Sequence, residues 1–154
     1  MTTTLRLYRR DDLDEVVHLW YHTWHYTFPF LRHPEPLEAW KTRLRDDIAK
    51  NETVWVAERD GQMVGFLALR ERDGYLNLLF VDPQFHHQGI GTALMNKAKH
   101  LSPSGLSLET LQLNREARAF YERHGFHVVS LGRNARNGQP DVRYCWMSVQ
   151  SEES

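Results

Sequence analysis

A glycine-containing turn at residues 88 to 92 is the part of this sequence best suited to chemistry. Its sequence is Gln-Gly-Ile-Gly-Thr, and it lies between an apolar run that ends in Asp82-Pro83 and a segment with helical periodicity. The first turn of a helix has free backbone N–H groups and the positive end of the helix dipole. Glycines at positions 89 and 91 let a bulky anion approach the backbone without meeting a Cβ atom. The motif therefore predicts an anion site, and diphosphate is the natural ligand.

The same two glycines could instead have a purely structural role. They can serve only to ease a tight passage from strand to helix, and this alternative stays open at this point. The dinucleotide-binding fingerprint requires a third glycine at residue 94, where Leu94 stands, and a phosphate-binding Walker loop requires Gly-Lys-Ser/Thr, which the sequence lacks. The spacing therefore excludes both of these nucleotide-binding motifs.

Histidines are the next candidates for chemistry. His18, His22 and His25 fall at i, i+4 and i+7, a spacing that could bind a metal ion. That stripe lies away from the apolar stripe of the same segment, so a solvated helix face is the favoured interpretation. The side chains of the adjacent His86 and His87 diverge, and no third ligand is near them in the sequence. We therefore predict no metal site.

Composition limits the remaining classes of function. The 154 residues fit a single domain, 1–154, and the 19 Lys and Arg residues against 20 Asp and Glu residues give no positive excess for nucleic acid. No run approaches the ~20 apolar residues of a membrane span. The only cysteine, Cys145, cannot form an internal disulfide and is expected to be a small hydrophobic residue rather than a nucleophile. These features predict a cytoplasmic protein that binds neither nucleic acid nor membrane.

Hydrophobic periodicity places these residues on an alternating series of elements. Strands are expected at residues 4–9, at three places within 53–82, and at 105–113, 126–133 and 141–149; helices are expected after Asp11-Asp12 and at 37–51, 89–100 and 114–125. Asp60-Gly61 and Asp73-Gly74 are typical of two-residue hairpin turns, so the meander is expected to be antiparallel. Gly125 should end the last helix. The order βααβββαβαββ implies an α/β (mixed α+β) fold with a mixed sheet and helices on both faces.

Two segments carry a resemblance to a known family. "LLFVDPQFHHQGIGTALM" (78–95) resembles the acyl-CoA-binding motif of the GNAT superfamily of N-acetyltransferases, and "LNREARAFYERHGF" (113–126) resembles the second signature of that superfamily. His86 departs from the pattern, because the family usually has Arg or Gln at this position. The resemblance implies a GNAT-like fold, with a central twisted mixed sheet of six to seven strands and about four helices on both faces.

The family pattern also implies roles for individual residues. The strand ending at Val81 should splay from the next strand, and the pantetheine arm of acetyl-CoA should hydrogen-bond to backbone near Leu79 and Val81. The backbone N–H of Phe80 or a neighbour should polarise the thioester carbonyl, and Tyr121 should act as general acid on the departing thiolate. The residues expected to bind acetyl-CoA are Leu79, Phe80, Val81, His86, His87, Gln88, Gly89, Ile90, Gly91, Thr92, Asn114 and Tyr121.

No motif fixes the acceptor or its general base. Glu71, Tyr75, Asn77 and the aromatic segment 20–33 are candidates to line an acceptor pocket. Near the predicted last hairpin, Arg133, Arg136 and Asp141 could reach the same side, although an exposed loop is the favoured interpretation.

The hypothesis is an acetyl-CoA-dependent N-acetyltransferase that acts by direct attack of a primary amine. The acceptor would be a small-molecule amine or a peptide amine, and the protein a monomer or homodimer. Two alternatives remain: a CoA-binding regulator or sensor without turnover, and a protein-interaction domain that uses the aromatic helix region.

Overall fold

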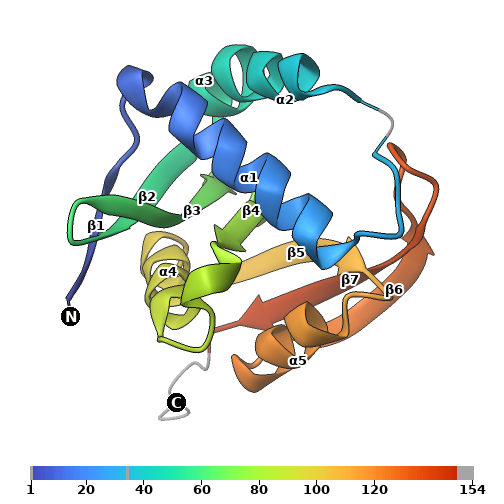
Figure 1. The fold of residues 1–154 in the computed structure, drawn as a ribbon. Coiled ribbons are helices and arrows are strands. Elements are labelled where there is room, and N and C mark those ends of the chain that lie inside the picture. Colours follow the sequence, from blue (N-terminus) through green and yellow to red (C-terminus); the bar gives the residue numbers. More distant parts are fainter. Residues whose placement is uncertain (1, 34, 149–154) are drawn as a thin grey trace, which may run out of the picture.

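A sheet of seven strands runs through the molecule in the order β1-β2-β3-β4-β5-β7-β6 (Figure 1). The computed structural model describes residues 2–33 and 35–148. The strands are β1 (Thr3–Leu7), β2 (Thr53–Arg59), β3 (Gln62–Arg70), β4 (Tyr75–Val81), β5 (Gly105–Leu111), β6 (His127–Arg133) and β7 (Pro140–Met147). All neighbouring strands are antiparallel except β4 and β5, which are parallel. The predicted mixed sheet is confirmed; Val149, the last residue of the predicted strand 141–149, lies outside the described residues.

Helices cover both faces of this sheet. They are α1 (Leu13–Thr27), α2 (Leu37–Arg43), α3 (Ala49–Asn51), α4 (Ile90–Leu101) and α5 (Arg115–Arg123). A π-helical turn at Leu44–Ile48 joins α2 to α3, so the helix predicted over 37–51 is one continuous segment with a wider turn in its middle. Gly125, with φ +90°, follows α5 in the left-handed conformation and ends it as predicted. Among the described residues, no helix combines the length and the apolar character that a membrane span requires.

Each face of the sheet has its own hydrophobic core. The α1 and α2 side buries two stripes of apolar residues at helical spacing: Val17, Trp20, Trp24, Trp40, Leu44 and Ile48. The opposite side buries Ile90, Leu94, Met95 and Ala98 of α4 against Leu67, Leu106 and Tyr144. Burying one such side chain contributes roughly 2 kcal/mol, so these stripes fix which face of the sheet each helix covers.

The two hairpins of the meander differ from each other. Asp60 and Gly61 have φ values of +53° and +78° and form the predicted two-residue turn between β2 and β3. The prediction of a two-residue turn at Asp73-Gly74 is wrong, because residues 71–74 form a four-residue turn. Within it the Asp73 N–H donates to the Arg70 carbonyl at 3.2 Å, and only Gly74 has a positive φ. The longer turn lets β4 begin directly opposite the end of β3.

β4 and β5 separate after a single point of contact. Their one pairing in the described chain joins Tyr75 to Ser107, beside a 2.8 Å hydrogen bond from the Ser107 N–H to the Gly74 carbonyl. Toward Val81 the strands diverge, and residues of both line a cleft of about 540 Å³. The splaying implied by the family resemblance is thus present. The cleft opens at the carboxyl ends of two parallel strands, where ligands commonly bind.

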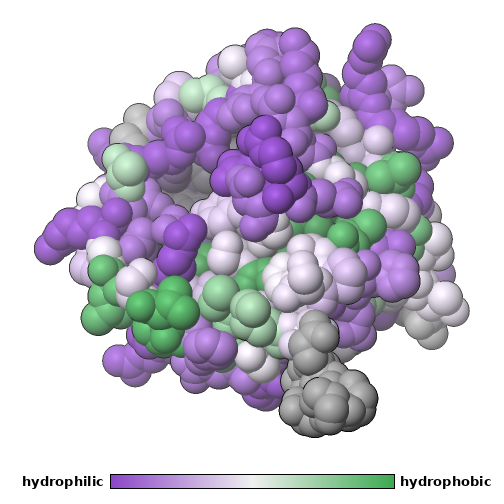
Figure 2. All heavy atoms as spheres, turned by 180° about the vertical axis from the view of Figure 1, so that it is seen from behind, coloured by the Kyte–Doolittle hydropathy of each residue, from purple (hydrophilic) through white to green (hydrophobic). Residues whose placement is uncertain are grey.

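β6 is an edge strand that lies outside both cores. All seven of its residues are exposed, and the apolar ones include Leu131, which is 66% exposed. Seen from behind, apolar side chains gather over this edge of the molecule (Figure 2); those exposed on β6 are Val128, Val129 and Leu131. The strand is therefore held by its pairing with β7 and not by burial of its side chains.

Candidate active site

The glycine turn forms the N-terminus of α4 and leaves its backbone donors free. Gly89 is the N-cap residue, with φ +84° in the left-handed region, and no side chain caps the helix. The first helical hydrogen bond runs from the Ala93 N–H to the Gly89 carbonyl at 3.0 Å. The N–H groups of Ile90, Gly91 and Thr92 consequently have no partner within the helix. A Cβ at Gly89 would meet nothing within 4 Å, so open space lies beside these donors.

Gly91 is required for a different reason from the one expected. A Cβ at this position would lie 3.2 Å and 3.3 Å from two ring carbons of Phe120, and 3.8 Å from a methyl of Val81. The glycine therefore lets α5 pack closely on α4 and does not provide an open approach for an anion. The expectation that both glycines clear the path of the ligand holds only for Gly89, because an aromatic ring covers the other.

A buried arginine lies next to the glycine turn. Arg59, at the end of β2, is 8% exposed. Its guanidinium donates to the Gln88 carbonyl at 3.3 Å, to the Thr3 hydroxyl at 3.0 Å and to the Gln88 side chain. In residues 2–33 and 35–148 it has no carboxylate partner. Sequence reasoning missed this residue, because it lies 29 positions before the residue that it contacts.

The two histidines before the turn take separate directions. His86 Nε2 lies 2.9 Å from the Val81 carbonyl oxygen, at the mouth of the cleft. His87 adopts a left-handed conformation, φ +64°, and its Nε2 lies 3.3 Å from a carboxylate oxygen of Glu116 on α5. A positive φ is strained for histidine. Here it turns the backbone so that the next residues enter α4 with their N–H groups pointing outward.

Backbone alternation along β4 decides which groups reach the cleft. The Asp82 N–H donates to the Val64 carbonyl of β3 at 2.8 Å. In an antiparallel ladder every second residue bonds the same neighbour, so the backbone of Phe80 also faces β3. The backbone groups of Leu79 and Val81 then face the cleft. The candidates for polarising the thioester carbonyl are therefore the N–H groups of Leu79 and Val81, the neighbours of Phe80, and not the N–H of Phe80 itself.

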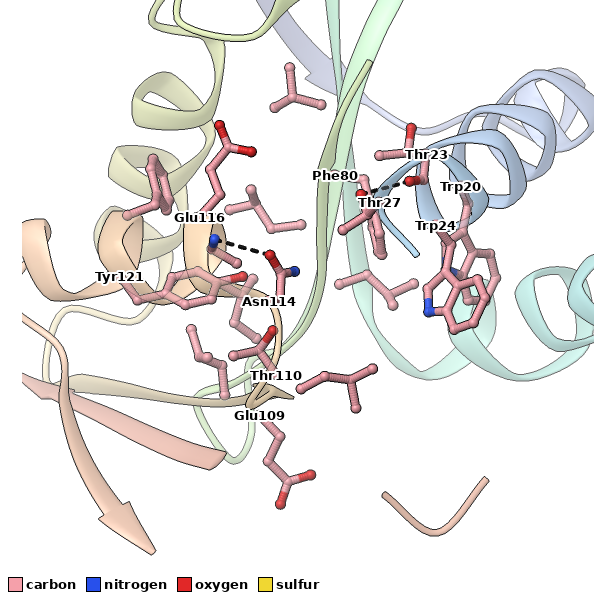
Figure 3. Close-up of a pocket in the computed structure, with 18 of the residues that line it drawn as sticks. Trp20, Thr23, Trp24, Thr27, Phe80, Glu109, Thr110, Asn114, Glu116 and Tyr121 are labelled. Atoms are coloured by element: carbon pink, nitrogen blue, oxygen red, sulfur yellow. Dashed lines mark hydrogen bonds between the residues drawn. The ribbon is translucent and has the colours of Figure 1, made fainter. Parts of the chain in front are cut away.

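Tyr121 and Asn114 come from α5 and its N-cap. Figure 3 shows the Tyr121 hydroxyl pointing into the cleft on the side of Asn114. Burial, with smaller effects of Tyr144 and Tyr75, raises the pKa of Tyr121 to about 12. Asn114 Oδ1 accepts a hydrogen bond from the Ala117 N–H at 3.2 Å, so Asn114 is the N-cap of α5. The phenol thus stays protonated throughout the neutral range while it faces the split between β4 and β5.

A carboxylate missed by sequence reasoning lies across the cleft. Glu109 on β5 lines the cleft and accepts a 3.3 Å hydrogen bond from the Tyr75 hydroxyl; its carboxylate points away from Tyr121 and Asn114 (Figure 3). Burial and the neighbouring Glu109 raise the pKa of Tyr75 to about 12. The alternation of "LSLETL" could have indicated the face on which Glu109 lies, but not that the adjoining strand would separate from it.

Asp141 is a second carboxylate on the same side. It lies on β7 opposite Leu111, is 8% exposed and lines the cleft. Its side chain makes no hydrogen bond or ion pair with any described residue. Burial and, to a smaller extent, Glu109 raise the pKa of this carboxyl above its usual range. An unpaired, poorly solvated carboxylate in a cleft is well suited to meet a cationic ligand.

The structure shows which of the other candidate residues line the acceptor pocket. Tyr75 and Asn77 line the cleft, whereas Glu71 lies in the β3–β4 turn and accepts a 2.6 Å hydrogen bond from the Thr53 hydroxyl. The aromatic segment supplies Trp20, Trp24, Phe28 and His33 to the wall. Arg136 also lines the cleft, so the interpretation of its loop as merely exposed is wrong. Arg133 does not line the cleft, because it donates to the Gly138 carbonyl at 2.8 Å.

The remaining chemical candidates have local roles. His18 and His25 each place Nδ1 2.8 Å from the backbone carbonyl four residues earlier. No group of three His, Cys, Asp or Glu residues that could hold a metal ion occurs in the described parts of the chain. Cys145 lies within β7, paired with Ser107 and His127 of the neighbouring strands, as expected for a small packing residue.

Comparison with known proteins points to one family. A family model described as an acetyltransferase (GNAT) domain matches residues 50–128. The peptidyl-lysine N-acetyltransferase YiaC of Escherichia coli K12 is 31% identical over 150 residues, covering 96% of this chain and 99% of that protein. The peptidyl-lysine N-acetyltransferase YjaB of the same organism is 29% identical over 145 residues, covering 91% of this chain and 92% of that protein.

A solved structure has the same fold. The PaiA N-acetyltransferase of Thermoplasma acidophilum, solved in complex with coenzyme A, superposes with a TM-score of 0.77 at 19% identity, over 96% of this chain and 99% of that one. At this identity the likeness concerns the arrangement of strands and helices.

Proposed function

Since this chain belongs to the GNAT superfamily of acetyltransferases, and is therefore an N-acetyltransferase, we propose that it transfers the acetyl group of acetyl-CoA directly to the side-chain amine of a peptide lysine. One observation carries the proposal: the β4–β5 split is bordered by the free N–H groups at the start of α4, by Tyr121 of α5 and by Glu109 of β5. A cofactor arm and an acceptor can meet there from opposite ends.

The N-terminus of α4 is the proposed site for the diphosphate of CoA. The free N–H groups of Ile90, Gly91 and Thr92 and the helix dipole favour an anion. Open space at Gly89 allows the approach, and the buried Arg59 guanidinium adds positive charge behind the turn. From this point the pantetheine arm would follow the cleft and bond the outward backbone groups of Leu79 and Val81.

The chemical step requires an unprotonated amine. The ammonium of a lysine has an ordinary pKa of about 10.4 and must lose a proton before it attacks. We assign this proton to Glu109, directly or through a water molecule. The free amine then attacks the thioester carbonyl carbon and forms a tetrahedral intermediate. The negative charge on its oxygen would be stabilised by the N–H of Leu79 or Val81.

Collapse of the intermediate releases CoA. The carbon–sulfur bond breaks and its electron pair leaves with the sulfur, while the nitrogen loses its extra proton to become an amide; that proton reaches the thiolate through solvent. Tyr121, the proposed acid, has a pKa of about 12, well above the ~8.5 of an ordinary cysteine thiol. Complete proton transfer from the phenol to the thiolate is therefore unfavourable at equilibrium. Its proposed contribution is a hydrogen bond to the sulfur as negative charge develops there.

The lysine acceptor is proposed from the relatives and the shape of the cleft. YiaC and YjaB are both named peptidyl-lysine N-acetyltransferases, and both similarities extend over more than nine-tenths of this chain. The acceptor half of the cleft is walled by aromatic rings of α1 and α2, against which an aliphatic lysine stem can pack. Its carboxylates, Glu109 and Asp141, suit the charged end.

Titration calorimetry with acetyl-CoA tests the first half of the proposal. Gly89→Val should abolish binding, because a β-branched residue is strained at φ +84° and its side chain enters the space beside the donors. Gly138→Val is the matched control: its φ is +73° and its Cβ also meets nothing, but it lies in the β6–β7 loop. Equal affinity in the wild type and in Gly89→Val would reject the site.

Release of the CoA thiol in the presence of a lysine peptide tests the second half. Thiol release that matches the amount of acetyl-lysine found by mass spectrometry supports direct transfer. Binding of acetyl-CoA without any peptide acetylation would reject the proposed acceptor and favour a regulator that only binds CoA.

A further inference from the structure

Two loops that are far apart in the sequence meet at the outer end of the acceptor cleft. The segment between α1 and α2 runs beside the loop between β6 and β7 (Figure 1). Arg136 of the second loop places Nη1 3.7 Å from a carboxylate oxygen of Glu35 in the first. The Arg136 backbone is fixed in turn, because its N–H donates to Asn134 Oδ1 at 2.8 Å. Arg136 is therefore held over the cleft although its side chain remains 48% exposed.

Arg43, the last residue of α2, adds a second cation to this end. Its guanidinium lies over the Trp20 ring, with Cζ 5.2 Å from the ring centroid, and it lines the cleft. Its Nε is enclosed without a hydrogen-bond partner, and across the described ranges no carboxylate pairs with it. Burial and the nearby Arg136 lower its pKa from the ordinary arginine value.

Among the described residues Arg43 forms no ion pair, although Glu35, Asp47 and Glu52 are near enough to affect its pKa. Glu35 is paired with Arg136 instead. A guanidinium beside a second cation is stabilised in its charged form when an anion binds between the two. A guanidinium also offers paired N–H donors that match the two oxygens of a carboxylate. This end of the cleft is therefore suited to bind an anion.

Carboxylates line the same cleft. Glu109 on β5 lies 4.0 Å from Arg143 Nε, and Asp141 on β7 has no side-chain partner among the described residues. An acceptor that fills the cleft would therefore meet carboxylates as well as guanidiniums. Such a lining favours a ligand that carries both an ammonium and an anionic group.

We infer that the preferred acceptor carries a carboxylate in addition to its amine, and that Arg43 and Arg136 bind this carboxylate while the amine lies against Glu109 and Asp141. The inference rests on the proposed function, because it names the acceptor of that same reaction. The carboxylate has two possible sources: an acidic side chain next to the lysine of a peptide, or the main-chain carboxylate of a lysine with a free C-terminus. Both would place an anion a short distance from the reacting amine.

Two matched pairs of substrates test the inference and separate the sources. The first pair is a blocked pentapeptide with one central lysine and either glutamates or glutamines on both sides. The second pair is Nα-acetyl-lysine and its C-terminal amide. The carboxylate-bearing member of at least one pair should have a kcat/KM higher by about tenfold, as expected for a charge-assisted hydrogen bond. The pair that shows the difference identifies the source.

Variants connect the preference to the two arginines. Arg136→Gln should reduce the preference to about twofold or less, and Arg43→Gln should do the same. Arg136 is the safer test, because its exposed side chain can be changed with little effect on folding. Arg72→Gln is the control: its side chain is 85% exposed and lies in the β3–β4 turn, outside the cleft. The control should keep the wild-type preference.

Failure of the inference is distinct from failure of the proposed function. Equal kcat/KM within each pair, or a preference that Arg136→Gln and Arg43→Gln leave unchanged, would overturn the role of the arginines while acetyl transfer stands. Acetyl-CoA binding without acetylation of any of the four substrates would instead reject lysine as acceptor and the inference with it.

Discussion

The Arg59 guanidinium donates to the backbone carbonyl of Gln88 at 3.3 Å, and so a buried cation from β2 is fixed to the first residue of the glycine turn. A buried arginine without a carboxylate partner is costly unless something compensates its charge. The diphosphate of CoA, bound at the N-terminus of α4, would supply that compensation. Arg59 is thereby proposed to take over part of the role that the family's Arg or Gln has at position 86, where this chain has histidine.

Replacing Arg59 with Gln is expected to weaken acetyl-CoA binding about tenfold, the loss of one charge-assisted interaction. Calorimetry at two salt concentrations measures it, and the variant's affinity should depend less on salt because one cation has been removed. Arg59→Lys, which keeps the charge, should recover part of the affinity. Arg70→Gln, at the far end of β3 from the turn, serves as control. An Arg59→Gln protein with wild-type affinity and salt dependence would contradict the assignment.

Tyr121→Phe is expected to lower kcat by about 10- to 100-fold, within the range for losing a positioned acid, with little change in acetyl-CoA affinity. Since burial raises the pKa of Tyr121 to about 12, the phenol remains protonated at all usable pH values. The wild-type rate should therefore show no alkaline decline below pH 10 that this residue could cause. Tyr26→Phe, whose side chain is 66% exposed, is the control. A full-rate Tyr121→Phe enzyme would remove Tyr121 from the mechanism.

Glu109→Gln removes the proposed proton acceptor and should change the pH dependence as well as the rate. At neutral pH nearly all of a lysine acceptor is protonated, so kcat should fall about 100-fold. Raising the pH toward 10 supplies free amine from solution, and the variant's rate should then approach that of the wild type. Steady-state rates between pH 6.5 and 10 measure this recovery, with Glu38→Gln on the surface of α2 as control. A variant profile parallel to the wild-type profile would argue against Glu109 as base.

The parts of the site that could be predicted from the sequence are those defined by local pattern. The helix that begins at the glycine turn, the helix that begins at Asn114 and the antiparallel meander before α4 all follow from residues close together in the chain. The Asp73-Gly74 dipeptide led to a wrong prediction, because the same dipeptide can form a two-residue turn or end a four-residue turn. The Gly-x-Gly spacing predicts that Gly91 leaves room for an anion. It could not show that the Phe120 ring, from another helix, packs against Gly91.

Residues that act through tertiary placement left no comparable signal. Glu109 becomes a cleft residue only because β4 separates from β5, and no residue near it in the sequence signals that separation. Arg43 and Arg136 lie 93 positions apart and share a pocket only when the two loops meet. A single sequence shows where charged residues lie and which segments form helices or strands. It does not show how those segments pack, and packing decides which charges face one another.

Asp141 links the stability of the protein to its activity. Its carboxyl is buried without a partner among the described residues, and its pKa is raised in the folded protein. A raised carboxyl pKa means that the folded state binds its proton more tightly, so this group costs stability at neutral pH and the cost disappears as the pH falls below its unfolded value. Asp141→Asn keeps the shape and removes the charge. It is therefore expected to raise Tm at pH 7 by a few degrees, on the order of 1 kcal/mol, and by less at pH 4.

The same change should lower kcat/KM for a cationic acceptor, because the amine loses a negative partner. Thermal unfolding at both pH values and steady-state kinetics measure the two effects, with the exposed, ion-paired Asp46→Asn as control. A variant that is no more stable than the wild type at pH 7 would show that the carboxylate is compensated in the free protein, and the acceptor would then have no unpaired charge to meet.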